Sequence, residues 1–150
     1  MNNQKPHNGR LEIPNFSGAY TATIQSQATV AVSDKADHMI AVSVASAVQR
    51  TSDANWNGAK LTIWGTADTV AGNGEQRGYF GNEHANGDID HGTFEATVTM
   101  SGSEVTLAGT WRFTGGTGMF AKVTGNGVFN GKQTSPTDSE ATWSGSYDLG

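Results

Sequence analysis

The stretch from Arg77 to Phe120 constrains the fold more than any other part of the chain, because it combines four apolar segments with three turn signals. Asn86-Gly87 predicts a two-residue hairpin turn, since both residues accept the positive φ that a type I′ turn requires. Gly102-Ser103 predicts a second turn, and the run from Gly115 to Gly118 predicts a third. We therefore expect an antiparallel meander of four strands.

These turns set a register in which most large apolar side chains of the stretch share one face. A slip of one residue in either of the first two turns would move them apart, so the turns and the apolar pattern support each other. Only Phe80 and Ile89 fall outside this face. The expected opposing pairs are Tyr79 with Phe94, Phe94 with Trp111, Val98 with Leu107, Met100 with Val105 and Phe113 with Phe120.

The composition fits a single all-β domain. A chain of 150 residues is long enough to bury a core. An apolar fraction of 35% is typical of strands that expose one face to water, and 20 glycines supply many turns. Four Trp, six Phe and three Tyr are available to bury, which argues against a disordered chain.

The other segments predict further strands around this meander. Residues 1–15 are polar and are expected to form a flexible arm, with residues 16–150 as the domain. Eight or nine antiparallel strands without a crossover helix either close into a barrel or split into a sandwich, and closure removes exposed edges. Outside the meander we expect one bent strand or two short ones in 17–34, and strands at 37–51, 60–70, 122–130 and 141–149.

Charge and cysteine content exclude several function classes. The net charge is −5 and no basic stripe is present, which argues against a nucleic-acid partner. The absence of cysteine excludes disulfides, thiolate catalysis and Cys-ligated metals. The N-terminal MNNQKPHNGR has no apolar core, so we expect no signal peptide or membrane anchor and a cytoplasmic location, unless the chain is a processed secreted form.

A resemblance to a known superfamily appears at Gly109–Phe129, GTWRFTGGTGMFAKVTGNGVF. It resembles the G-G-T-G-x-F-x-G-x-x-G-x-G-x-F signature of the allene oxide cyclase and dirigent-like barrels. HANGDIDHGTFEATVTM and ATWSGSY resemble uncharacterised bacterial members of the same superfamily. The resemblance covers about residues 60–148 and implies an eight-stranded, calycin-like antiparallel barrel with an apolar internal cavity, often oligomeric. It implies cofactor-free chemistry or binding, but it transfers no catalytic residue, and Lys122 stands where the pattern has Gly.

Two carboxyl groups are candidates for acid–base chemistry. The predicted turn at Asn86-Gly87 places Glu83 opposite Asp90 on the apolar, inward face, beside Tyr79. Two carboxylates in a poorly hydrated site cannot both ionise at low cost, so one pKa should rise. Such a group suits proton transfer near neutrality, and Glu83 is the expected proton-handling residue. The alternative is that both carboxyl groups are rim residues in water.

Other inward residues would complete a pocket. If Asn73-Gly74 is also a two-residue turn, Trp64 lies opposite Glu83 and Asp68 opposite Tyr79, although this turns Leu61 and Ile63 outward as a surface for self-association. If the GGTG turn is symmetric, Lys122 lies opposite Trp111 and can act as a base in a dry pocket, unless a bulge turns it outward. The expected substrate-binding residues are Trp64, Asp68, Phe94, Trp111, Phe113 and Trp143.

No metal site is expected. His84 and His91 share a face in the predicted register, but Glu83 and Asp90 occupy the opposite face. Two imidazoles alone would need a third ligand from elsewhere to hold Zn²⁺.

Three functions remain open. The first is a cofactor-independent cyclase, isomerase or lyase that acts on a small hydrophobic molecule, with Glu83, Asp90, Tyr79 and Lys122 as catalytic residues. The second is a lipocalin-like or dirigent-like binding module, and the third a structural barrel with a filled core. An open cavity containing Glu83 favours the enzyme, a cavity with Glu83 in water favours the binding module, and no cavity favours the third. We favour the enzyme narrowly, as a homodimer or homotrimer.

Overall fold

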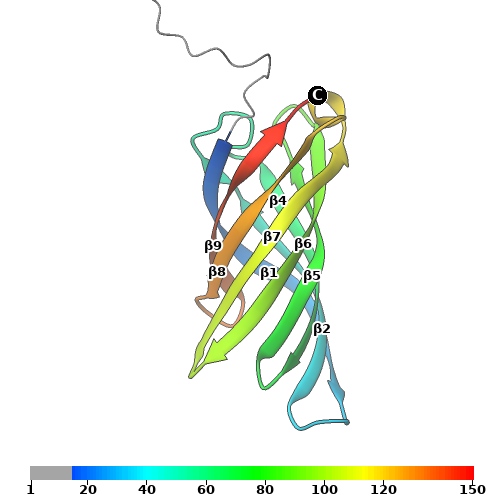
Figure 1. Cartoon of the computed structure of the whole chain (residues 1–150), viewed down its shortest axis with the longest axis vertical. Coiled ribbons are helices and arrows are strands. Elements are labelled where there is room, and N and C mark those ends of the chain that lie inside the picture. The colour runs from blue at the N-terminus through cyan, green and yellow to red at the C-terminus, as the bar shows by residue number, and fades with distance from the viewer. Residues whose placement is uncertain (1–14) are drawn as a thin grey trace, which may run out of the picture.

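The computed structural model describes residues 15–150, which form nine antiparallel strands (Figure 1). The predicted N-terminal arm lies outside the described residues, apart from Asn15, which begins the first strand. The elements are β1 (Asn15–Val32), β2 (His38–Val48), β3 (Arg50–Thr51), β4 (Lys60–Val70), β5 (Asn73–Glu83), β6 (Ile89–Ser101), β7 (Glu104–Gly116), the 3-10 helix η1 (Gly118–Phe120), β8 (Thr124–Gln133) and β9 (Asp138–Asp148).

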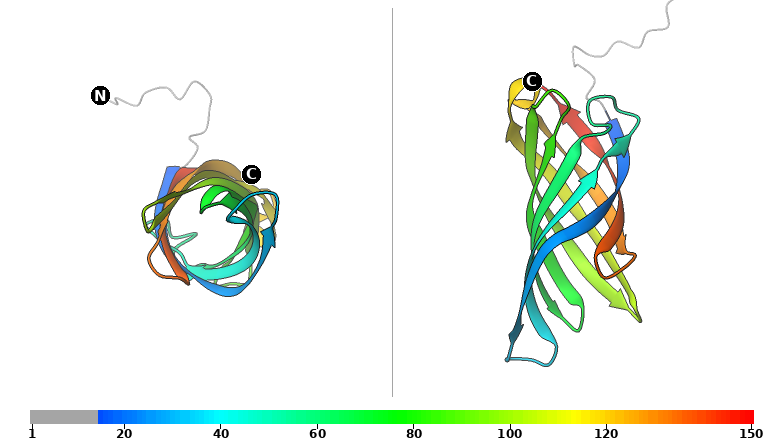
Figure 2. Two further views of the ribbon diagram at one scale, coloured as in Figure 1. Left: turned by 90° about the horizontal axis from the view of Figure 1, so that it is seen from below. Right: turned by 180° about the vertical axis from the view of Figure 1, so that it is seen from behind.

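The sheet closes into a barrel-like ring. Neighbouring strands follow the order β2-β4-β5-β6-β7-β8-β9-β1-β3, and β1 also pairs with β2. β1 closes the ring because its N-terminal half pairs with β9 and its C-terminal half pairs with β2. The register of its pairing with β2 shifts between Ile24 and Ser26. β1 is thus the single bent strand, one of the two forms expected from the sequence. Viewed from below, the strands surround a central space (Figure 2).

The predicted register between β6 and β7 is confirmed. Phe94 pairs with Trp111, Val98 with Leu107 and Met100 with Val105. Phe94 and Trp111 point into the ring and are 8% and 9% exposed. The Trp111 ring has room because glycines stand beside it: a Cβ at Gly127 or Gly145 would lie 2.7 or 2.6 Å from its Cζ2.

The predicted turn at Asn86-Gly87 was wrong by one residue. Gly87 has φ 89° and donates its N–H to the carbonyl of His84, whose own N–H bonds to Asp88. These features define a three-residue loop in which Gly87 occupies the left-handed position. Tyr79 consequently pairs with Thr93, and Glu83 with Ile89.

The slip reverses the faces of β5. Phe80 now points inward, where it lies over Gly92, because a Cβ on that glycine would come within 2.2 Å of the phenyl ring. Tyr79 is 65% exposed, and Glu83 is also exposed on the outer face. The missing side chain of Gly92 therefore favours the observed register over the predicted one.

The predicted turn at Asn73-Gly74 was also wrong. Val70 pairs with Asn73, so the turn consists of Ala71 (φ 52°) and Gly72 (φ 81°). Positive φ at both central residues defines a type I′ turn. The Asn73 side chain instead accepts a hydrogen bond from the Met100 N–H of the neighbouring strand, at 2.9 Å.

This turn also reverses the predicted faces of β4. Leu61 is 4% exposed, and both it and Ile63 point inward. Trp64 pairs with Tyr79 on the outer face and is 43% exposed. The predicted outward, self-associating surface at Leu61 and Ile63 is therefore wrong. The homodimer or homotrimer itself stays a prediction.

The GGTG segment does not form a symmetric turn. After β7 the chain enters η1, and β8 begins only at Thr124, so Trp111 pairs with Gly127. Lys122 lies in the connection between η1 and β8, exposed to solvent, and not opposite Trp111 as predicted. Phe120 is not a strand partner of Phe113 but belongs to the same buried cluster.

The two ends of the ring differ. One end, here called the closed end, carries the loop of residues 52–59, the β5–β6 loop, η1 and the C-terminus (Figure 1). The other, called the open end, carries the β1–β2, β4–β5, β6–β7 and β8–β9 turns. Within residues 15–150 the structure contains no helix that is long and apolar enough to cross a membrane.

Candidate functional site

Aromatic side chains fill the closed end of the ring. Trp56, from the loop between β3 and β4, is 1% exposed, and so is Phe120 from η1. The indole of Trp56 stacks on Phe113 with ring centroids 5.5 Å apart and meets Phe120 edge-on at 5.1 Å. Phe16 of β1 lies 5.0 Å from the same indole. The loop therefore closes this end with packed rings.

The loop that carries Trp56 is fastened to the last strand. The Tyr147 hydroxyl donates a hydrogen bond to Asp53 Oδ2 at 2.8 Å, and Asp53 Oδ1 accepts from the Asn55 N–H. Burial, together with the hydrogen bond to Asp53, raises the pKa of Tyr147. The Trp56 ring is in turn 4.6 Å from the Tyr147 ring, so β9 holds the loop by both polar and aromatic contacts.

A network of buried polar side chains adjoins these rings on the side of the open end, and we call it the floor network. Asp90 is 0% exposed, and each of its carboxyl oxygens has at least one partner. The contacts are Trp143 Nε1 to Gln49 Oε1 (2.9 Å), Gln49 Nε2 to Asn82 Oδ1 (3.1 Å), Asn82 Nδ2 to Asp90 Oδ1 (2.9 Å), Trp56 Nε1 to Asp90 Oδ2 (3.0 Å) and His84 Nε2 with Asp90 Oδ2 (2.6 Å).

The floor network is complete within the described residues. No buried side-chain nitrogen or oxygen there lacks a hydrogen-bond partner. A buried carboxyl is tolerated in a protein when its oxygens are paired in this way. Four members of the network also line the adjoining pocket, namely Gln49, Asn82, Trp56 and Trp143. Asp90 and His84 do not line it. Asp90 therefore anchors the floor and does not reach the pocket.

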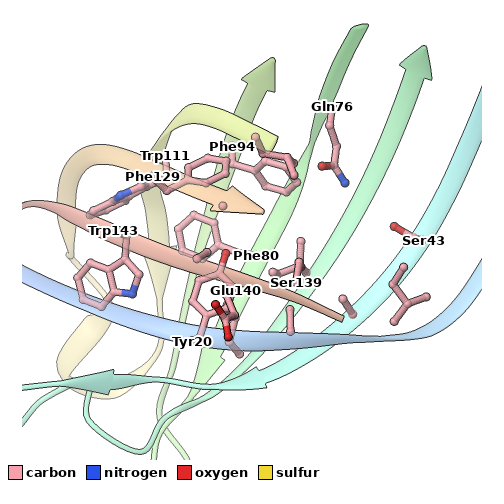
Figure 3. Close-up of a pocket in the computed structure, with 18 of the residues that line it drawn as sticks. Tyr20, Ser43, Gln76, Phe80, Phe94, Trp111, Phe129, Ser139, Glu140 and Trp143 are labelled. Atoms are coloured by element: carbon pink, nitrogen blue, oxygen red, sulfur yellow. The ribbon is translucent and has the colours of Figure 1, made fainter. Parts of the chain in front are cut away.

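A pocket of about 280 Å³ occupies the inner face of the ring above this floor. It extends to Gln133 and Thr137 beside the β8–β9 turn, and both residues are exposed, so the pocket reaches solvent at the open end. Figure 3 shows aromatic side chains from several strands around one part of it. The aromatic residues that line it are Phe16, Tyr20, Trp56, Phe80, Phe94, Trp111, Phe113, Phe129 and Trp143.

Uncharged polar side chains line the pocket beyond these rings. Ser43 and Gln76 lie away from the tryptophans in Figure 3, and Tyr20 projects from β1. Burial raises the pKa of Tyr20 to about 12, so its hydroxyl stays protonated at neutral pH. The pocket therefore offers uncharged hydrogen-bonding groups, in addition to Asp138 and Glu140 beside the β8–β9 turn.

The predicted binding residues divide into two groups. Phe94, Trp111, Phe113 and Trp143 line the pocket as expected. Trp64 and Asp68 do not, because the Ala71-Gly72 turn places both on the outer face.

Asp68 belongs to a different cluster on the outer face. Its Oδ1 lies 2.6 Å from His38 Nε2, and the Nδ1 of the same imidazole contacts Asp34. The hydrogen bonds to Asp34 and Asp68 raise the pKa of His38.

The predicted catalytic residues are not brought together. Glu83, Tyr79 and Lys122 are exposed, and Asp90 alone is buried. The predicted pairing of Glu83 with Asp90 was wrong, since Asp90 pairs with Asn82 and Glu83 with Ile89. The three-residue loop is the physical reason, because it shifts β5 by one position against β6.

The two histidines of this hairpin do not share a face as predicted. His84 points inward to Asp90, whereas His91 is exposed. Within residues 15–150 no group of three or more His, Asp or Glu side chains is arranged to hold a metal ion.

Tyr20, Trp56, Phe80 and Gln76 line the pocket but were not predicted to do so. The even-numbered series Phe16, Tyr20, Ala22 and Ile24 carried a usable signal, because alternate residues of a strand share a face. Trp56 also carried a usable signal, because it is a large aromatic residue in an otherwise polar loop. Phe80 and Gln76 could not be found without the correct turn.

No protein-family model and no curated protein matches this sequence.

Proposed function

We propose that this protein binds a small, largely apolar molecule in the pocket, as a non-catalytic barrel of the lipocalin-like or dirigent-like kind. One observation carries the proposal: the inner face encloses about 280 Å³ that is walled by aromatic rings and reaches solvent at the open end. Ligand sites are typically concave and mostly apolar, with few polar groups for orientation. Barrels of about eight strands are either filled by side chains or hold one small ligand.

Binding is a better-supported proposal than catalysis. The carboxyl group expected to transfer protons, that of Glu83, lies on the exposed outer face, as does Tyr79. Lys122 is exposed in the connection between η1 and β8. Asp90 is buried, but its oxygens are occupied by Trp56, Asn82 and His84. A general acid or base must come within hydrogen-bonding reach of the substrate, and none of the four expected residues lines the pocket.

We also propose that the ring is a barrel of the allene oxide cyclase-like type, with the pocket as its internal cavity. The support is the resemblance of Gly109–Phe129 together with the all-antiparallel ring of the structure. Within that segment, Gly127 gives room to the Trp111 ring, which is a packing role for this glycine.

The test is to fill the pocket. Ala67 lines it, and its neighbour Thr66 is exposed on the outer face. Ala67→Phe should weaken binding of the uncharged fluorescent dye N-phenylnaphthylamine at least about tenfold, since the new ring takes the ligand's space. Thr66→Phe, the matched control, should bind the dye as the natural protein does.

Fluorescence titration measures dye binding, and thermal unfolding shows whether both variants remain folded. Failure of the natural protein to bind the dye, or of solvent extraction and mass spectrometry to find any co-purified small molecule, would count against a binding function. Equal affinities of the two folded variants would show that the dye binds elsewhere.

A further inference from the structure

The pocket lining has an unusual charge distribution. Among the described residues that line it there is no lysine, arginine or histidine. The two ionisable carboxyl groups among them belong to Asp138 and Glu140 of β9, next to the β8–β9 turn. The net charge of the whole chain is also negative, with 14 acidic residues against nine basic ones. A ligand inside the pocket therefore meets no positively charged side chain.

Three polar side chains of the pocket lining are uncharged and open to the cavity. Tyr20, Ser43 and Gln76 make no side-chain hydrogen bond with other described residues. Because no buried nitrogen or oxygen in the described part of the chain lacks a partner, these groups face open space and not packed protein. They can donate to, or accept from, an alcohol, ether, carbonyl or amide of a ligand.

The aromatic walls meet at nearly right angles. The interplanar angle is 89° between Trp111 and Trp143, 85° between Phe80 and Trp111, and 80° between Phe94 and Phe129. A space bounded by one ring face and the edge of the next suits a flat ring, which stacks on one wall and meets the other edge-on. Figure 3 shows Trp111, Phe129 and Phe94 along one side of the pocket.

We propose that the pocket selects uncharged, ring-containing molecules and rejects carboxylates and other anions. This inference rests on the proposed binding function and narrows its ligand class. An anion in the pocket would lose its hydration without gaining a positive partner, and burial of an unpaired charge is strongly unfavourable. The carboxyl groups of Asp138 and Glu140 add repulsion near the entrance.

A matched pair of dyes tests the selection. N-phenylnaphthylamine and anilinonaphthalene sulfonate share the same aromatic body, and only the second carries a negative charge. The natural protein should bind the uncharged dye at least about tenfold more tightly than the sulfonated dye, as measured by fluorescence titration at low and high salt. Equal affinities would overturn the charge selection and leave the binding function standing. Absence of binding by the uncharged dye would instead overturn the proposed function.

A lysine introduced into the pocket tests whether the lack of a positive charge there causes the selection against anions. Gln76→Lys adds one positive charge inside the pocket, and Thr97→Lys adds the same charge on the exposed outer face. Gln76→Lys should improve binding of the sulfonated dye at least about tenfold, whereas Thr97→Lys should change it less than about twofold. Gln76→Met, which changes the side chain without charge, should give no gain.

Two results would contradict the role of the pocket. An equal gain in Gln76→Lys and Thr97→Lys would assign the selection to the net charge of the protein. A gain in Gln76→Met would assign it to side-chain shape. Circular dichroism and retained binding of the uncharged dye confirm that each variant is folded with its pocket intact.

Discussion

The contribution of a side chain to the stability of this protein depends on the face of the sheet on which it lies. Phe94 and Trp111 are cross-strand partners that point inward, and each is less than a tenth exposed. Thr93 and Glu95 flank Phe94 in sequence, yet their side chains point away from the pocket. Large aromatic side chains in a core contribute through buried area and close packing, so neighbouring positions should differ sharply in their effect on stability.

Phe94→Ala and Trp111→Ala should each lower the free energy of unfolding by about 3–5 kcal/mol, because each removes a buried aromatic ring. Glu95→Ala, at an exposed position, should change it by less than about 0.5 kcal/mol, and Thr93→Ala, at a half-buried outer-face position, by less than about 1 kcal/mol. Chemical denaturation monitored by circular dichroism measures all four. Similar losses in the two sets would mean that the inward assignment of β6 is incorrect.

At the scale of elements, the turns decide which face each strand presents. The Ala71-Gly72 turn puts Trp64 outside and Leu61 inside, and the loop at Gly87 puts Glu83 outside and Asn82 inside. Ala71 takes φ 52°, a conformation that a residue with a Cβ adopts at some energetic cost. The turn is kept because the pairing it sets buries the apolar face of β4.

Ala71→Asn should raise the free energy of unfolding by about 0.5–1 kcal/mol, since Asn tolerates the left-handed region and Asn-Gly is favoured in type I′ turns. Ala121→Asn is the matched control, because Ala121 is also exposed but has φ −59°. The control should show no gain. The midpoint of urea unfolding distinguishes the two, and a gain at both positions would point to an effect of Asn unrelated to φ.

At the scale of the whole molecule, the ring combines a packed end with a hollow one. Trp56, Phe120 and the floor network fill the closed end, whereas the pocket extends from the floor toward the open end. Regions with fewer packed side chains open more easily. A ligand in the pocket should therefore stabilise the hollow half more than the closed end, which is already packed.

Binding of N-phenylnaphthylamine should slow amide hydrogen exchange mainly in the strand segments around Val98 and Leu107, which pair across β6 and β7 beside the pocket. Exchange near Trp56 and Phe120 should change much less, because those residues are fully packed without ligand. Hydrogen exchange followed by mass spectrometry makes the comparison. Protection confined to the closed end would place the dye outside the pocket.

The sequence by itself determined the strand content and part of the pocket. Alternation of apolar and polar residues in 89–101 and 104–116, with a single tight turn between them, was sufficient for the pairing of Phe94 with Trp111. It also identified Phe94, Trp111, Phe113 and Trp143 as pocket-lining residues. These inferences depend on local turn chemistry and on the two-residue period of a strand, and both are properties of nearby residues.

Only the tertiary structure decided the faces of β4 and β5, and with them the candidate site. Asn86-Gly87 is compatible with loops of two or three residues, and the choice depends on distant packing: Gly92 makes room for the Phe80 ring, and Asn82 meets buried Asp90. The bend in β1 that closes the ring and the placement of Trp56 over its end also need partners far along the chain. Because the strand period is two, one residue of slip was enough to move Glu83 from the predicted pocket into water.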